Sequence, residues 1–226
     1  GDSHVTMYRT LVAEGSHLFD GLEVDFWYVT GWKFNSVRVK NGILAHPTNT
    51  GIAPPMDPVD LNIYDLILIA GCRIKLITMF EEVMNAIRDH GCHFSSFFLQ
   101  EAIENHLLAL PGNRRVLDIR AGYSGEVFFV PSPLRSAGTD GTKGISSERA
   151  HALKDLYQYM WQVVVDYYEA HGIRTARIPW NTIQNGYLVK PSFNLADDDP
   201  LQKHSRFAEM ILRNEILEAI TKRERA

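Results

Sequence analysis

Cysteine is scarce in this sequence: its 226 residues include two, Cys72 and Cys92. Two cysteines define no disulfide framework, so a pair of reduced thiols in a reducing compartment is the simplest interpretation.

Long hydrophobic runs are also lacking. The longest covers residues 66–70, which is the length of a strand and far short of a membrane span. With no visible signal peptide we expect a cytoplasmic protein, although the chain starts at Gly1 without an initiator methionine, and a removed leader would leave the same sequence.

No large excess of either charge is present. The net charge of -4 comes from 23 basic and 27 acidic residues, and it gives no reason to expect nucleic acid or a membrane as a partner. No Gly-x-Gly-x-x-Gly or Walker loop follows a predicted strand, which disfavours a nucleotide cofactor. His90, His93 and His106 lack close ligand spacing, so neither a metal nor another cofactor is expected. The expected partner is therefore a small molecule. The sequence leaves the oligomeric state open.

The first half of the chain alternates between helical and strand-like patterns. Apolar residues recur at helical spacing over residues 5–19, and residues 22–30 are rich in strand-forming types. Residues 37–39 and 43–45 flank Lys40-Asn41-Gly42, which predicts a hairpin. A Pro- and Gly-rich loop follows at 48–58. Residues 66–70 then form a continuous apolar run, which is typical of a strand buried on both faces.

The second half continues the alternation. Helices are predicted over residues 77–89, 97–110, 147–171 and 205–220, with Pro111-Gly112 ending the second of them. Strands are predicted at residues 127–130 and 175–178, and an acidic turn at 197–200. Strands alternating with helices favour a parallel sheet with helices on both faces. We therefore expect residues 1–226 to form a single α/β domain, a three-layer doubly wound parallel sheet.

The chain opens with Gly1-Asp2-Ser3-His4 and runs directly into a predicted helix. A serine at a helix N-terminus lies among free backbone N–H groups, which can stabilise an oxyanion. This opening resembles the Gly-Asp-Ser block of the SGNH (GDSL-type) hydrolase superfamily, whose serine is the nucleophile. The resemblance implies a flavodoxin-like α/β fold and a nucleophilic Ser3. Alternatively, Ser3 belongs to a short segment left over from a cloning vector, and Met7 is the first residue of the natural protein.

Two further blocks of the family have counterparts at strand ends. Gly31 follows the predicted strand 22–30, at the place where the family has an oxyanion-hole glycine. Gly71-Cys72-Arg73 follows the strand 66–70, where the family has Gly-x-Asn. The resemblance thus implies an oxyanion hole from Gly31 and Gly71 with Arg73 in place of the amide. Arginine can donate to an oxyanion, but its reach and geometry differ from those of asparagine, and Arg73 can instead pair with a buried carboxylate.

The fourth block, Asp-x-x-His before the last helix, is altered more strongly. Asp199-Pro200-Leu201-Gln202 occupies it, so Gln202 stands at the position of the general base and cannot take a proton at neutral pH. His204 lies two residues further on and is the candidate replacement, with Asp199 or Asp198 orienting it. If Gln202 and His204 are both already helical, their side chains point about 200° apart and His204 cannot replace the base. If the helix starts at Ser205, the extended residues before it can direct His204 toward the site. An alternative register places His204 itself at the base position, with Asp199 displaced by two residues. His204 can equally be a polar residue near a helix start.

The family's first strand, which precedes Gly-Asp-Ser and lies in the middle of the sheet, has no counterpart before Gly1 in the sequence. Without it, a doubly wound sheet would leave two rows of backbone N–H and C=O groups unpaired. Three alternatives follow: the strand precedes Gly1 in a longer chain, another segment or another chain fills the gap, or Gly1-Asp2-Ser3 is not the family's first block.

Two functions from different classes follow from these residues. The first is a serine ester hydrolase or O-acyltransferase for a small acyl ester, such as an O-acetylated carbohydrate, in which Ser3 attacks and His204 accepts the proton. The second is a catalytically inactive SGNH-like domain that binds a ligand or a partner, as Gln202 and Arg73 suggest. An unrelated doubly wound α/β protein is a third alternative.

Overall fold

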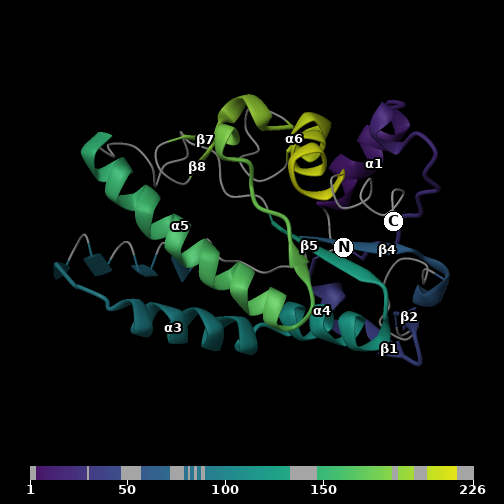
Figure 1. The fold of residues 1–226 in the computed structure, drawn as a ribbon, viewed down its shortest axis with the longest axis horizontal. Helices are drawn as coiled ribbons and strands as arrows, with labels where there is room; N and C mark the ends of the chain where they lie inside the picture. Colours follow the sequence, from purple (N-terminus) through teal and green to yellow (C-terminus); the bar gives the residue numbers. More distant parts are fainter. Residues whose placement is uncertain are drawn as a thin grey trace.

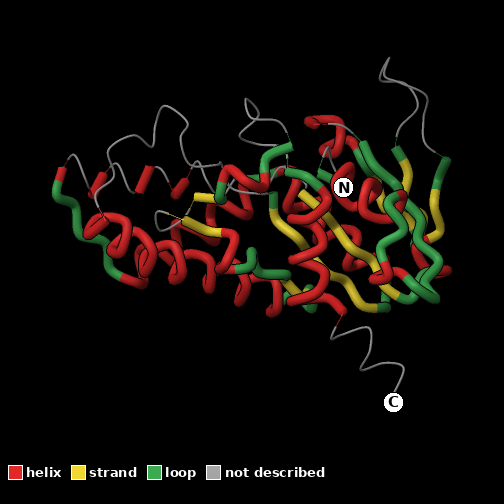
Figure 2. Tube along the Cα trace, turned by 90° about the horizontal axis from the view of Figure 1, so that it is seen from above, coloured by secondary structure: helices red, strands yellow, loops and turns green. Residues whose placement is uncertain are grey.

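A computed structural model describes residues 4–29, 31–46, 57–71, 79–80, 82–83, 86–87, 90–132, 147–184, 188–195 and 203–217. It is a mixed α/β structure: a small parallel sheet of three strands is flanked by helices, and separate antiparallel sheets lie beside it (Figure 1). Seen from above, most strands gather in one half of the molecule, and helices extend beyond them into the other half (Figure 2).

The parallel sheet has the order β4 (Leu66–Gly71), β5 (Glu126–Pro131) and β6 (Arg174–Thr175). β4 and β5 pair over their whole length, from Leu66 opposite Glu126 to Gly71 opposite Pro131. The central strand β5 is the most buried, because both of its edges are paired and both of its faces are covered. The strands predicted at 66–70 and 127–130 are confirmed. The last predicted strand is shorter and begins earlier, at Arg174.

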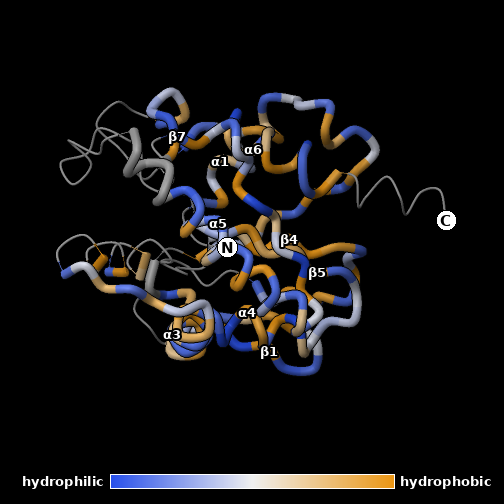
Figure 3. The backbone as a smooth tube through the Cα atoms, turned by 60° about the vertical axis from the view of Figure 1, so that its left-hand side comes forward, coloured by the Kyte–Doolittle hydropathy of each residue, from blue (hydrophilic) through white to orange (hydrophobic). Residues whose placement is uncertain are grey.

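Helices cover both faces of this sheet. α3 (Ser96–Ala109), α4 (Pro111–Gly122) and α5 (Ser147–Ala170) lie on one side, whereas α1 (Val5–Ala13) and α6 (Ser205–Ile211) pack against each other on the opposite side (Figures 1 and 3). The helices predicted at 97–110 and 147–171 are confirmed, and the described residues of the one predicted at 77–89 are helical. None of the helices described here is long and apolar enough to cross a membrane.

α4 was not expected from the sequence. Pro111 ends α3, as predicted, but it also occupies the first turn of a new helix after the single extended residue Leu110. Proline suits this position because its missing N–H would be unpaired there anyway. The buried Asn113 then joins α4 to α5, since its side-chain amide donates to the Tyr167 hydroxyl at 3.0 Å and accepts from the Tyr168 hydroxyl at 2.9 Å.

The predicted hairpin is confirmed as β1 (Arg38–Lys40) and β2 (Ile43–Ala45), and β3 (Val59–Asp60) extends it to a three-stranded antiparallel sheet. Its turn has positive φ at both central residues, 53° at Asn41 and 78° at Gly42, which is the conformation that Asn-Gly favours. A second antiparallel pair consists of β7 (Ile183–Gln184) and β8 (Leu188–Val189).

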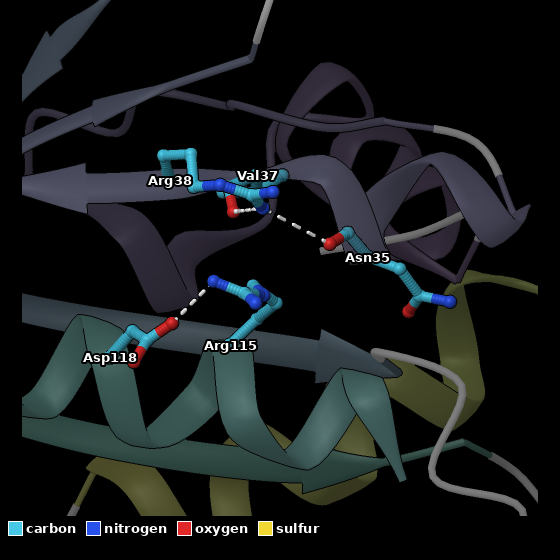
Figure 4. A network of polar contacts seen from close by, with 5 residues as sticks. All are labelled: Asn35, Val37, Arg38, Arg115 and Asp118. Atoms are coloured by element: carbon cyan, nitrogen blue, oxygen red, sulfur yellow. Dashed lines mark hydrogen bonds and ion pairs between the residues drawn. The ribbon is translucent and has the colours of Figure 1, made fainter.

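Arginines occupy the junction between this hairpin and α4 (Figure 4). Arg38 donates to the carbonyls of Asn35 and Val37 at 3.4 and 3.0 Å, and Arg115 of α4 pairs with Asp118 at 2.5 Å. Each of these contacts joins residues that are close in sequence, so none of them links the hairpin to α4.

Three sequence predictions for the outer elements were wrong in extent or type. The first helix ends at Ala13 instead of residue 19, because Gly15 turns the chain at φ 70° and a short 3₁₀ helix follows at His17–Phe19. Residues 22–29 form an extended chain rather than a strand, since no described strand pairs with them, while Thr30 lies outside the described residues. The last α-helix covers Ser205–Ile211 and continues as a π-helical turn over Leu212–Ile216.

Candidate functional site

One predicted site residue, Gly71, lies at the carboxyl end of β4, and ligands of open parallel sheets bind at that edge. Gly71 closes β4 there with φ +79°, so the chain leaves the sheet in a conformation that glycine adopts without strain. Gly31 begins the 3₁₀ helix η2 (Gly31–Ser36) rather than following a strand. Of the other predicted site residues, Ser3, Arg73, Asp199 and Gln202 lie outside the described residues, as do Cys72 and Asp198. His204 is therefore the one predicted site residue with a described side chain.

His204 is the N-cap of α6. Its backbone is extended, with φ −81° and ψ 172°, and helical geometry begins at Ser205. Its ring Nδ1 accepts a hydrogen bond from the backbone N–H of Arg206 at 3.1 Å. Helix N-termini leave such N–H groups without partners, and side chains that accept from them stabilise the helix.

The second ring nitrogen of His204 is engaged as well. Because Nδ1 accepts from a backbone N–H, a neutral ring carries its proton on Nε2, which lies 2.9 Å from the carbonyl oxygen of Ser192 and donates to it. A triad histidine instead donates from one nitrogen to a carboxylate and leaves the other free to take the proton of serine. In this arrangement both nitrogens of His204 bond to backbone groups, so neither is free for that chemistry.

The chain around His204 is anchored to the 3₁₀ helix η6 (Pro191–Phe193). The backbone N–H of His204 donates to the carbonyl of Phe193 at 3.1 Å, and the Phe193 ring contacts the rings of both His204 and Phe207. Lys203 is 4% exposed, and its ammonium group donates to the side-chain oxygen of Asn194 at 3.0 Å. Sequence reasoning missed this buried lysine, because nothing in the local pattern distinguishes it from the polar residues on either side.

Sequence reasoning also missed a cavity of about 810 Å³ beside β4. It is lined by residues of α1 and of the C-terminal helix, by the extended segment 21–27, and by β4 with the residues that precede it. Tyr8 of α1 is among them; it is 3% exposed, and within the described part of the chain its hydroxyl has no hydrogen-bond partner. Burial raises the pKa of Tyr8, so the hydroxyl is a neutral donor throughout the physiological range.

Metal-ligating side chains do not cluster: among the described residues, no three His, Cys, Asp or Glu side chains lie close enough together to hold a metal ion. Comparison with protein-family models, with curated proteins and with solved structures found no match to this chain.

Proposed function

We propose that this chain is a ligand- or partner-binding domain built on an SGNH-type α/β framework, and that it does not hydrolyse esters efficiently. The observation that carries the proposal is the capping role of His204, whose two ring nitrogens both bond to backbone groups. Two amino-acid replacements support it: Gln202 stands at the position of the family's general base, and Arg73 at that of its oxyanion amide. Removing the base from a serine triad costs orders of magnitude in rate.

A second candidate is the serine ester hydrolase or O-acyltransferase that the sequence resemblance implies. The extended backbone of His204 favours it, because a residue that precedes the helix can change its direction when the two hydrogen bonds of its ring break. In that reaction Ser3 attacks the acyl carbonyl and His204, oriented by Asp199 or Asp198, takes the proton. The N–H groups of Ser3 and Gly31, with Arg73, stabilise the oxyanion. Breaking two hydrogen bonds costs about 2 kcal/mol, so the freed ring would be roughly 30-fold less populated.

Hydrolysis of p-nitrophenyl acetate separates the two candidates. We expect the wild-type chain, Ser3→Ala and His204→Ala to share one background rate, within about twofold. His204→Asn is the matched control, because asparagine also caps helices but cannot act as a base. A loss of about a thousandfold in both Ser3→Ala and His204→Asn, with the latter still folded, would establish the hydrolase instead.

A further inference from the structure

The cavity beside β4 lies between the parallel sheet and the helices that cover one of its faces. Leu66, Leu68 and Ala70 line it from β4. Because successive side chains of a strand point to opposite faces, these three share one face of the sheet. Residues of α1 and of the C-terminal helix line the cavity as well, together with the extended segment 21–27. The cavity is therefore a space between two layers of the fold.

The burial of the lining residues shows where this cavity opens. Tyr8, Ala70 and Ile216 are only 3%, 2% and 1% exposed, whereas Leu66 at the start of β4 is half-buried. Ile63, which precedes β4, is 71% exposed. Exposure thus rises toward the amino end of β4, so the mouth of the cavity lies at that edge of the sheet. This is the edge opposite to the one that the sequence resemblance selects.

Acidic side chains gather around the cavity, and its described lining residues include no lysine, arginine or histidine. The acidic ones are Glu23, Asp25, Asp65 and Glu126. Glu126 is neutralised by Arg174, whose guanidinium group lies 2.5 Å from the carboxylate. Glu23 and Asp25 are exposed, and neither pairs with a basic side chain among the described residues. These two carboxylates therefore carry the charge of the mouth.

Tyr64 shows that both carboxylates lie at the mouth. It precedes β4, and its hydroxyl donates to the Asp25 carboxylate at 2.9 Å. Partial burial, this hydrogen bond and the negative charges of Asp25 and Glu23 together raise the pKa of Tyr64. The hydroxyl carries no charge of its own, so it leaves the negative potential of the two carboxylates in place. Such a potential favours a cation.

Basic side chains on the surrounding elements do not offset this potential. Arg9 of α1 lies over the Tyr28 ring, 5.0 Å from its centroid, and Arg213 pairs with Glu209 at 2.8 Å. Neither arginine lines the cavity. An anionic ligand would therefore lose its hydration without gaining a counter-ion, which is unfavourable.

Tyr8 supplies a hydrogen-bond donor in the inner part of the cavity. Its hydroxyl has no partner among the described residues, and burial keeps it neutral. The other buried residues around it, Val5, Leu212 and Ile216, are apolar. A ligand that reaches this end must be mainly apolar, and it gains a hydrogen bond if it carries an acceptor there.

We propose that this cavity binds a cationic amphiphile, with an ammonium group beside Glu23 and Asp25, an elongated apolar body, and a hydrogen-bond acceptor that meets Tyr8. A cavity of about 810 Å³ lies within the range of about 300–1,000 Å³ that is typical of small-molecule sites. The inference names a ligand class for the proposed binding role and rests on it.

Three probes with the same ten-carbon chain separate the effect of the head group: decylamine, decanol and decanoate. Each is titrated into the full chain by calorimetry, below its micelle concentration. We expect micromolar binding of decylamine, about three- to tenfold tighter than decanol and at least about tenfold tighter than decanoate. Raising the salt concentration from about 0.05 to about 0.5 M should remove most of the preference over decanol. Equal affinities for the three probes, or no binding, would overturn the proposal.

A double variant at the mouth tests the role of the two carboxylates. Glu23→Gln with Asp25→Asn should abolish the preference for decylamine and leave the affinity for decanol within about twofold. The matched control, Glu101→Gln with Glu169→Gln, removes two exposed carboxylates from α3 and α5 on the other side of the sheet and should keep the preference. A preference that survives the first double variant, or that the control also removes, would contradict the proposed site.

The inner end is tested with the N,N-dimethylamide of 10-aminodecanoic acid, which has a carbonyl acceptor but no ester bond. It should bind the wild-type chain about three- to tenfold more tightly than Tyr8→Phe, whereas decylamine should bind both equally. Equal binding of the amide to both chains would overturn the assignment of Tyr8.

Filling the cavity tests the location of the ligand. Leu68→Trp should abolish binding of decylamine, whereas Leu108→Trp, at an exposed position of α3, should not. Binding that persists in a folded Leu68→Trp chain would overturn the proposal, and the variants at the exposed mouth keep it testable if Leu68→Trp does not fold. None of these measurements depends on ester hydrolysis, so a failure here is distinct from a failure of the proposed function.

Discussion

His204 contributes to stability as a helix cap, and this role is measurable without any reference to catalysis. Its Nδ1 satisfies the N–H of Arg206 at the start of α6. Replacement of a capping side chain by alanine costs about 1 kcal/mol, whereas other good caps retain most of the stability. We therefore expect His204→Ala to lower the free energy of unfolding in urea by about 1 kcal/mol, and His204→Asn to lower it by less than half as much.

The two variants together decide what the ring does for the fold. Equal losses in both would show that the bond from Nε2 to Ser192, or the ring contact with Phe193, matters more than the cap. No loss in either would mean that the ring is not held as the structure has it, which would also remove the main argument against a catalytic His204.

The sequence left two roles open for His204, a general base and a polar residue near a helix start. Histidine just before the last helix was expected, and the helix does begin at Ser205. The hydrogen bond to Ser192 depends on a residue 12 positions away, which no local pattern reveals. Tyr8 and Lys203 were missed for the same reason, since the burial of a single polar side chain is a property of the packed molecule.

Among the elements, the Asn41-Gly42 hairpin is constrained by the positive φ of both turn residues. Gly42 has φ +78°, and a Cβ at this position would overlap the side-chain amide of Asn62. Gly21 has the same φ of +78° but has no atom within 4 Å of such a Cβ, so it is a matched control. We expect Gly42→Ala to lower the melting temperature clearly more than Gly21→Ala, because strain of about 1 kcal/mol is common to both and the overlap is not.

Thermal unfolding followed by circular dichroism measures this difference. Equal shifts in the two variants would mean that Asn62 moves aside at no cost, and that the hairpin is held less tightly to the residues after β3 than its contacts indicate.

Prediction of the elements succeeded where the signal was local or fully buried. The apolar runs at 66–70 and 127–130 became β4 and β5, and Asn41-Gly42 formed its turn. Prediction failed where the type of element depends on pairing with another strand. Residues 22–29 are rich in strand-forming types, but no described strand pairs with them. α4 was missed because polar and charged residues dilute its apolar periodicity, so that Val116 and Ile119 are its main core contacts.

At the scale of the whole molecule, two buried tyrosines connect stability to alkaline pH. The hydroxyls of Tyr8 and Tyr157 are buried without partners among the described residues, and burial raises the pKa of both. In the unfolded chain they ionise near a pH of about 10. Their contribution to folding is thus fully present below that pH and is lost as the pH rises further, by about 1.4 kcal/mol for each tyrosine at a pH of roughly 11.

Tyr8→Phe and Tyr157→Phe should therefore each move the midpoint of alkaline unfolding upward, as followed by circular dichroism. At pH 7 neither variant should destabilise the chain by more than about 1 kcal/mol, because each removes a buried hydroxyl that has no partner among the described residues. A midpoint that stays in place in both variants would show that these hydroxyls are accessible to water.

The mixed α/β character and the parallel pairing of β4 with β5 followed from the alternation of strands and helices. The doubly wound sheet of the predicted fold stays a prediction, since the described parallel sheet has three strands and ends at β4.

The central claim, that this is a binding domain without an activated Ser3, is tested most directly with a fluorophosphonate probe. Such probes react with a serine only when a base and an oxyanion hole activate it. Intact-mass analysis of the full chain after incubation should show no adduct, identical to Ser3→Ala. A stoichiometric adduct on Ser3 that is absent from Ser3→Ala would contradict the account and establish a serine hydrolase.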